Sequence, residues 1–169
     1  AAVHAAGANT HSAAKSFAKI TAFKGRGQTH SIPIQDRHFE LIDDSYNACP
    51  ISVSAAIEVL SFLTPKFNGR RICVFGDMNE LGDNSTKLHN ALADKINNAK
   101  VDFVYTVGPQ MERMCDQLNS KIKVAHAERS EDLIQPLLHL VEPGDILLIK
   151  GSANLKMHKV VDYFLKFKN

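Results

Sequence analysis

The residues best able to do chemistry follow apolar runs that are typical of strands. Asp43-Asp44 comes directly after Leu41-Ile42 and is followed by Ser45-Tyr46-Asn47. Adjacent carboxylates at a strand end can bind a metal ion, the hydroxyl pair of a ribose or a neighbouring lysine, and they are equally typical of a turn that starts a helix. Tyr46 adds a stacking face and a hydroxyl group, and Asn47 adds an amide donor and acceptor. Both precede a predicted helix N-terminus, which favours anions.

A second candidate is Lys150-Gly151-Ser152, which follows the last apolar run of the chain. The lysine can neutralise a phosphate or a carboxylate, and Gly151 allows a close approach to the backbone. The default expectation, however, is an exposed lysine in a turn. The run is not a phosphate-binding Gly-x-x-x-x-Gly-Lys-Ser/Thr loop, because that loop needs two glycines around the lysine.

Two glycine-containing segments complete the set. The run Gly76-Asp77-Met78-Asn79-Glu80-Leu81-Gly82 places two glycines and two carboxylates in a loop before a predicted helix. Gly25-Arg26-Gly27 can present an arginine fork to a phosphate, or it can be a basic turn between two domains. Neither segment identifies a ligand by itself.

Cysteines and histidines carry less information. The three cysteines include no Cys-x-x-Cys and the eight histidines no His-x-x-x-His pair, so we predict neither a disulfide framework nor a zinc site, and a cytosolic protein fits this usage. Cys49 precedes a helix N-terminus, a position that lowers the pKa of a thiol, whereas Cys73 lies within a predicted strand. His126 ends another strand and is the one histidine of interest. We expect the histidines of helical segments on the surface: His89, His139 and His158.

The elements that position these residues can be read from the spacing of the apolar side chains. Four short apolar runs are continuous rather than alternating, which is typical of strands buried on both faces of a parallel sheet. These runs are Arg71–Phe75, Val101–Val107, Ile122–Ala125 and Asp145–Ile149. Earlier in the chain, residues 28–34 and 38–43 are separated only by Gln35-Asp36-Arg37, which predicts an antiparallel hairpin.

Helical patterns lie between the predicted strands. A short helix is expected over residues 9–22, and a second begins at Pro50, a residue that suits a first helical turn. Later stripes at helical spacing are Leu88, Ala91, Leu92 and Ile96; Met111, Met114, Cys115 and Leu118; Leu133, Ile134, Leu137, Leu138 and Val141, with Ser130 as the expected N-cap; and Met157, Val160, Val161 and Phe164. Together they predict an α/β fold with a Rossmann-like, doubly wound, mostly parallel sheet and an antiparallel edge hairpin. In such sheets ligands bind beyond the carboxyl ends of the strands, where the candidate residues gather.

Composition excludes several classes of protein. The chain has 169 residues, 44% of them hydrophobic and 22% charged, which is typical of one folded domain with at most a small appendage. With 20 basic and 18 acidic residues and no basic block, it lacks the charge pattern of a nucleic-acid-binding protein. No apolar run approaches the roughly 18 residues that a membrane span requires.

Several segments together resemble the C-terminal domain of the Mur ligase family, over about residues 24–169. These segments are Gly25-Arg26-Gly27-Gln28, Ile42–Pro50, Gly69–Ile72, Phe75–Gly82, Pro143-Gly144-Asp145 and Lys150-Gly151-Ser152. Three of these are similar in particular to the members that add D-alanyl-D-alanine to UDP-N-acetylmuramoyl-tripeptide, cytoplasmic enzymes of bacterial cell-wall synthesis: Gly69–Ile72 with Phe75–Gly82, and Pro143-Gly144-Asp145 leading to Lys150-Gly151-Ser152. Two positions depart from the family pattern: Cys49 replaces an asparagine, and Ala153-Asn154 stands where an arginine is usual.

The resemblance implies an ATP-dependent ligase that uses Mg²⁺ and forms an acyl phosphate on the tripeptide, which the amine of D-alanyl-D-alanine attacks. It implies that Asp44 accepts hydrogen bonds from the ribose hydroxyls. The nucleotide-binding residues that it implies are Arg26, Asp44, Tyr46 and Asn47. The substrate-binding residues that it implies are Gly76, Asp77, Lys150, Gly151 and Ser152.

The resemblance also implies a division of the chain. Residues 1–24 correspond to the terminal helix of the family's central ATPase domain, and residues 25–169 to its C-terminal domain. The chain holds no Gly-x-x-Gly-Lys-Thr phosphate loop and none of the family's magnesium-holding residues. We therefore expect a fragment that is inactive alone, carries no catalytic residue of its own, and acts together with its central and N-terminal domains.

Two alternatives from other classes remain open at this point. A receiver-like signalling domain also uses an acidic pair, an aspartate, a threonine and a lysine at strand ends, which Asp43-Asp44, Asp77, Thr106 and Lys150 imitate. An extra strand–helix unit between Thr106 and Lys150 argues against it. The other alternative is a nucleotide-binding module without catalysis.

Overall fold

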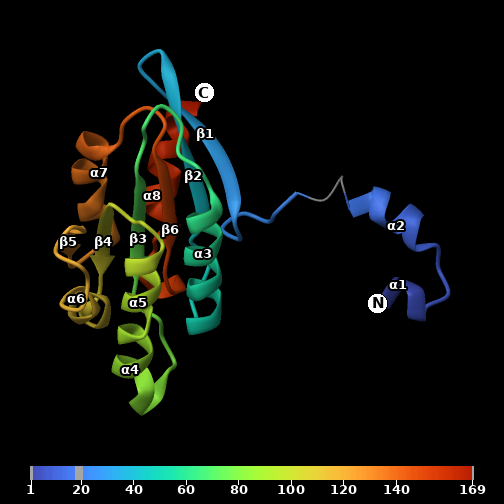
Figure 1. The fold of residues 1–169 in the computed structure, drawn as a ribbon, viewed down its shortest axis with the longest axis horizontal. Coiled ribbons are helices and arrows are strands. Elements are labelled where there is room, and N and C mark those ends of the chain that lie inside the picture. The colour runs from blue at the N-terminus through green and yellow to red at the C-terminus, as the bar shows by residue number, and fades with distance from the viewer. Residues whose placement is uncertain (1, 18–20, 169) are drawn as a thin grey trace.

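The centre of the protein is a six-stranded mixed sheet, seen in the computed structural model, which describes residues 2–17 and 21–168 (Figure 1). The strand order is β1-β2-β6-β3-β4-β5. The strands are β1 (Gln28–Ile34), β2 (Arg37–Asp44), β3 (Arg71–Gly76), β4 (Phe103–Val107), β5 (Lys123–Ala127) and β6 (Ile146–Lys150). Strand β1 pairs antiparallel with β2, and every other pair is parallel. The predicted α/β fold with an antiparallel edge hairpin is confirmed.

Helices cover both faces of the sheet. The helices are α1 (Ala2–Ala5), α2 (Thr10–Phe17), α3 (Pro50–Phe62), α4 (Ser85–Asn90), α5 (Leu92–Asn98), α6 (Pro109–Cys115), α7 (Ile134–Leu140) and α8 (His158–Leu165). Apolar residues of α3, α5 and α6 pack on one face, and those of α7 and α8 on the other. The sheet is therefore the middle of three layers, as a doubly wound fold requires.

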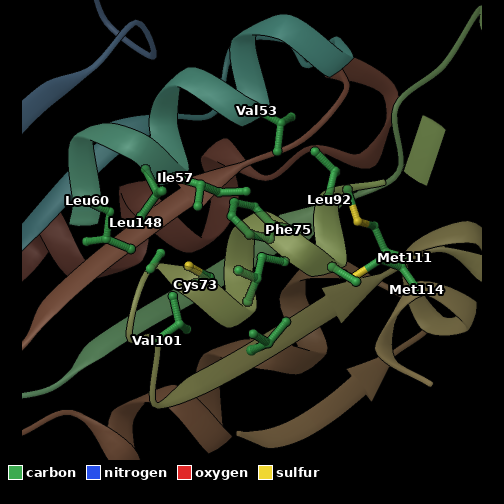
Figure 2. Close-up of a cluster of buried hydrophobic side chains, with 14 of the residues drawn as sticks. Val53, Ile57, Leu60, Cys73, Phe75, Leu92, Val101, Met111, Met114 and Leu148 are labelled. Carbon is green, nitrogen blue, oxygen red and sulfur yellow. The ribbon is translucent and has the colours of Figure 1, made fainter. Parts of the chain in front are cut away.

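The central strands are buried on both sides because their alternate residues enter different cores. Cys73 and Phe75 of β3 join the cluster under α3, α5 and α6, whereas Ile72 and Val74 join the cluster under α7 and α8. Figure 2 shows the first cluster, in which side chains of α3 face Phe75 and Leu148 of the sheet. This is why these runs are continuously apolar in sequence.

Strand β5 does not follow the prediction of burial on both faces. Lys123, Val124 and His126 are exposed, and β5 stands at the end of the strand order, next to β4. An edge strand is covered less fully than a central one, and its place at the edge is set by strand order rather than by its own residues. The run Ile122–Ala125 was therefore correctly predicted as a strand but wrongly as an interior one.

Three helical details also differ from the prediction. The stripe from Leu88 to Ile96 belongs to two helices, α4 and α5, which meet at the exposed Ala91. Ser130 is not a side-chain N-cap: it begins a 3-10 turn after the extended Arg129, and its hydroxyl donates to Glu131 Oε2 at 3.0 Å. The helix expected over residues 9–22 is described only as Thr10–Phe17, and residues 21–23 are not helical. Ala18 and Ile20 of that predicted helix lie outside the described residues.

Candidate functional site

The candidate residues meet at one edge of the sheet, where three parallel strands end together. Strand β6 lies between β2 and β3, and the register sets Asp44 opposite Lys150 and Lys150 opposite Phe75, the residue before Gly76. The loops that follow β2, β6 and β3 therefore share one rim. This is the carboxyl edge, where open α/β sheets bind their ligands.

Asp43 organises the turn that precedes the sheet and is not free for a ligand. It is fully buried, its Oδ2 accepts the Gly25 N–H at 2.9 Å, and its Oδ1 accepts the Ser45 hydroxyl at 2.5 Å. Its backbone carbonyl accepts the Gly27 N–H at 2.8 Å. Gly25 has φ +76°, and a Cβ on it would lie 3.0 Å from Tyr46 Cβ, so this turn requires glycine. Asp43 thereby fixes Arg26 beside the end of β2.

Asp44 and Lys150 form an ion pair between neighbouring strand ends. Lys150 Nζ lies 2.6 Å from Asp44 Oδ2 and donates a second hydrogen bond to the Asn47 carbonyl at 3.0 Å. The lysine side chain is 2% exposed and that of Asp44 22%. The expectation of an exposed turn lysine is therefore wrong, and of the three partners considered for the acidic pair, the structure supplies the lysine.

The four predicted nucleotide-binding residues line one cleft of about 230 Å³. The Arg26 guanidinium lies 4.2 Å from the centre of the Tyr46 ring, a cation–π arrangement that keeps the arginine at the mouth. Tyr46 is 56% exposed even with Arg26 over its ring, so part of its surface remains available for stacking. A neighbouring groove of about 480 Å³, mainly apolar, shares Arg26, Asp44 and Ser52 with this cleft. Together they offer polar groups for a sugar next to apolar surface for a ring.

Cys49 stands at the start of α3, on the wall of the same cleft. It is the N-cap residue of the helix, and its backbone N–H donates to Ser52 Oγ at 3.0 Å. The pKa of the exposed Cys49 thiol is lowered, chiefly by the hydrogen bond with the Ser52 side chain and also by Lys150. The predicted lowering of this pKa is therefore confirmed in direction, and the Ser52 side chain is its main cause.

A second, polar cleft of about 450 Å³ opens on the other side of the Asn47–Cys49 loop. Its other walls are Asn79–Leu81, after β3, and Ser152–Asn154, after β6. The Asn79 amide donates to Asn154 Oδ1 at 2.5 Å and joins these two walls. Of the predicted substrate-binding residues, only Ser152 lines this cleft.

The other predicted substrate residues have structural partners. Gly76 and Gly151 pack so closely that a Cβ on Gly151 would lie 3.0 Å from Gly76 Cα. Both carboxylate oxygens of Asp77 accept backbone N–H groups at the start of α6, from Gln110 at 3.1 Å and Met111 at 2.7 Å. Gly76, Asp77 and Gly151 thus hold together the loops that carry the two clefts. That these three residues contact a substrate stays a prediction.

Sequence reasoning missed Asn79, Glu80 and Asn154 as lining residues of the second cleft. Glu80 belongs to the Gly76–Gly82 run that was noted as a loop, and its positive φ of +61° marks a turn with a non-glycine residue. Asn154 was noted only as a departure from the family pattern, and its place in the cleft depends on the proximity of two loops whose bonded residues are 75 positions apart.

Two histidines have well-defined environments. His89 is fully buried, so its prediction as a surface residue is wrong: the turn after β3 covers it, and the Met78 N–H donates to its Nε2 at 2.9 Å. His126 Nδ1 lies 2.9 Å from the hydroxyl of the buried Thr106. His126 lines neither cleft.

The residues at the rim do not suit a magnesium ion. Within residues 2–17 and 21–168, no group of three or more histidine, cysteine or acidic side chains is arranged to hold a metal. The two adjacent carboxylates are already engaged, Asp43 by N–H and O–H donors and Asp44 by Lys150. A cation with near-octahedral oxygen coordination has no ready set of ligands here.

The class of protein follows from comparison with known families. Residues 25–153 match the family described as Mur ligase, glutamate ligase domain, and the chain belongs to the Mur ligase family as its C-terminal domain. Within that family it is MurF-like. It is 38% identical over 151 residues to the UDP-N-acetylmuramoyl-tripeptide–D-alanyl-D-alanine ligase of Rickettsia prowazekii, covering 89% of this chain and 32% of the relative. The ligase of the same name from Bacillus subtilis is 31% identical, and the match covers 93% of this chain and 35% of the relative.

Solved structures agree with the sequence matches. The MurF ligase of Thermotoga maritima in complex with ADP has a TM-score of 0.70 and 28% identity, covering 89% of this chain and 32% of that one. A MurF structure from Acinetobacter baumannii has a TM-score of 0.77 and 26% identity, and the match covers 97% of this chain and 35% of that one. The chain spans about a third of the length of the relatives that it matches. Family membership leaves the receiver-like alternative without support.

None of the helices in the described part of the chain combines the length and the apolar character of a membrane span.

Proposed function

We propose that this chain is the C-terminal domain of an ATP-dependent ligase that joins D-alanyl-D-alanine to UDP-N-acetylmuramoyl-tripeptide in peptidoglycan synthesis. The observation that carries the proposal is that Arg26, Asp44, Tyr46 and Asn47 line one cleft at the carboxyl edge of the sheet. Two facts support it. Relatives named UDP-N-acetylmuramoyl-tripeptide–D-alanyl-D-alanine ligase match most of the chain, and a MurF structure with the same fold is a complex with ADP.

The reaction brings together a nucleotide, a carboxylate and an amine, so the sites that bind them must adjoin. ATP phosphorylates the terminal carboxylate of the tripeptide to an acyl phosphate, and the amine of the dipeptide then attacks the carbonyl carbon so that phosphate leaves. Both steps depend on charge neutralisation and on the orientation of two substrates. Two clefts separated only by Asn47–Cys49 suit that requirement, because their ligands would meet at one loop.

The first cleft is proposed to take the ribose and the base of the nucleotide. The Asp44 carboxylate is partly exposed and has acceptor capacity beyond its bond to Lys150, so it can accept a hydrogen bond from a ribose hydroxyl. Tyr46 offers its exposed ring, and Arg26 offers a cation next to that ring. Lys150 acts here as the partner that holds Asp44 in place.

The second cleft is proposed to take the dipeptide. Its amide side chains can bind peptide groups, and the Glu80 carboxylate can bind the ammonium of an incoming zwitterion. Ser152 is the one predicted substrate residue on its wall.

The rest of the ligase is proposed to lie in other domains of a longer cytoplasmic protein. Residues 1–24 would end the central ATPase domain and residues 25–169 would form the domain described here. The phosphate groups and Mg²⁺ would be bound by the central domain. The domain alone is then expected to be inactive.

Steady-state kinetics of the full-length ligase test the proposal. Asp44→Ala and Tyr46→Ala are each expected to raise the KM for ATP about ten-fold or more, since each removes a group from the nucleotide cleft. Asp36→Ala, which changes an exposed carboxylate in the β1–β2 turn, serves as control. An unchanged KM for ATP in both cleft variants would refute the assignment, and a full-length protein without D-alanyl-D-alanine-dependent ATP turnover would refute the function.

A further inference from the structure

Three consecutive backbone N–H groups after β3 are each held by a different element. The Asp77 N–H donates to the Val107 carbonyl of β4 at 3.0 Å, and the Asn79 N–H donates to Ser152 Oγ after β6 at 2.9 Å. Between them, the Met78 N–H donates to Nε2 of His89 on α4 at 2.9 Å. The loop that forms one wall of the second cleft is thus fixed at three successive residues.

The middle contact requires one particular form of His89. Nδ1 of the ring lies 2.8 Å from the Ser85 carbonyl oxygen, which can only accept, so Nδ1 carries the proton. Nε2 faces the Met78 N–H and must present a lone pair. The buried ring is therefore neutral and in its Nδ1–H tautomer.

We propose that His89 is a positioning residue for the second cleft, which it controls through the Met78 N–H. The inference rests on the proposed function in one respect, namely that this cleft takes the amine substrate. One residue beyond the anchored Asn79, Glu80 adopts φ +61°, a conformation that costs energy for a non-glycine residue and persists where its neighbours are fixed. With the Met78 anchor lost, the Asn79–Leu81 wall can relax and Glu80 leaves its place at the cleft.

The effect is expected to be confined to one substrate. The nucleotide cleft is lined by residues of the 25–52 region and by Lys150, and none of residues 77–81 is among them. A looser loop therefore weakens binding of the dipeptide while leaving the affinity for ATP unchanged.

Two substitutions separate positioning from core packing. His89→Gln keeps an acceptor oxygen that can reach the Met78 N–H, whereas His89→Leu fills the space without an acceptor. His139→Leu is the matched control, because His139 on α7 makes the same type of contact, 2.8 Å from Nδ1 to the carbonyl oxygen four residues earlier, but its ring is exposed. Ser152→Ala removes the neighbouring anchor at Asn79 and provides a second variant should His89→Leu not fold.

The test combines hydrogen exchange of the 76–82 peptide with kinetics, both in the full-length ligase. His89→Leu is expected to speed exchange in that peptide and to raise the KM for D-alanyl-D-alanine about ten-fold, the loss of one hydrogen bond, at an unchanged KM for ATP. Ser152→Ala should also speed exchange in that peptide, but because Ser152 itself lines the cleft, its KM does not report on the loop alone. His89→Gln and His139→Leu are expected to stay within about two-fold of the parent. Exchange that is equally slow in His89→Leu and the parent, or equally fast in the Leu and Gln variants, would overturn the role of His89. Faster exchange with an unchanged KM for the dipeptide would instead overturn the proposed occupant of the cleft.

Discussion

Lys150 Nζ lies 2.6 Å from Asp44 Oδ2, and this pair joins the carboxyl ends of two adjacent parallel strands that are 106 residues apart in the chain. The cation is almost completely removed from water, and its second acceptor is the Asn47 carbonyl. Because the carboxylate also lines the nucleotide cleft, one interaction fixes the rim of the sheet and sets the charge at its mouth.

Replacing one partner of this ion pair is expected to cost more stability than replacing both partners. Asp44→Asn leaves a buried ammonium without its counter-charge and should lower the free energy of unfolding by about 3 kcal/mol. The double variant Asp44→Asn with Lys150→Met removes the stranded charge and should recover most of that loss. Denaturant unfolding of the single and double variants measures both values.

Asp162→Asn is the matched control for the same experiment. It breaks the ion pair between Lys24 and Asp162, whose side chains are 67% and 43% exposed. An exposed pair contributes about 0.2–1 kcal/mol, so the control should change stability little. Equal losses for Asp44→Asn and Asp162→Asn would contradict the importance given to the burial of Lys150.

The fold was predictable where one local pattern has one structural cause. Strands β3, β4 and β6 contain long apolar runs because successive apolar residues enter one or the other of two cores, and that cause acts along the strand itself. For β5 the same kind of apolar run gave a wrong prediction of burial on both faces. The exposure of this strand depends on its place in the strand order, which its own residues do not determine. The insertion of β6 between β2 and β3 is a tertiary fact of the same kind, and without it Asp44 and Lys150 could not be recognised as partners.

The candidate site was predictable in part for a related reason. Asp44, Tyr46 and Asn47 follow a single strand end, so local signals singled out that segment. Arg26 lies before the hairpin, and it was grouped with them only by the resemblance to the Mur ligases. The second cleft is made by three loops distant in sequence, and its lining residue Asn154 has no local signature. His89 shows the same limit: as a histidine of a helical segment it was expected on the surface, whereas the turn at Met78 buries it.

Cys49 is expected to be the most reactive of the three cysteines. Its pKa is lowered by the Ser52 side chain, whereas burial raises the pKa of Cys115 to about 11 and raises that of Cys73 as well. A lower pKa gives more thiolate at neutral pH, and thiolate is the reactive form. Alkylation with iodoacetamide at pH 7.5, followed by peptide mass spectrometry, should therefore label Cys49 at least about ten-fold faster than Cys115.

Substitution of the hydrogen-bond partner tests the cause of that reactivity. Ser52→Ala should shift the pH–rate profile of Cys49 alkylation to higher pH, because the bond that favours the thiolate is gone. Ser54→Ala, two residues further along α3, is the control and should leave the profile in place. If Ser52→Ala leaves the profile unchanged, the lowered pKa does not come from Ser52.

The stability of the α8 region is expected to depend on pH through Glu131. This carboxylate pairs with Lys159 of α8, and that hydrogen bond lowers its pKa from 4.5 to about 2. A carboxylate whose pKa is lowered by folding stabilises the protein fully above its unfolded value and loses this contribution as the pH falls towards the folded value. The stability difference between the parent and Glu131→Gln should therefore be constant above about pH 5 and should narrow progressively towards pH 2.5.

The side chains of Glu131 and Lys159 are both more than a third exposed, so the difference at pH 7 should stay within the ~0.2–1 kcal/mol of exposed pairs. Thermal unfolding at a series of pH values measures it, with Glu128→Gln as the exposed control; a difference that persists unchanged at pH 2.5 would show that Glu131 acts through packing rather than charge.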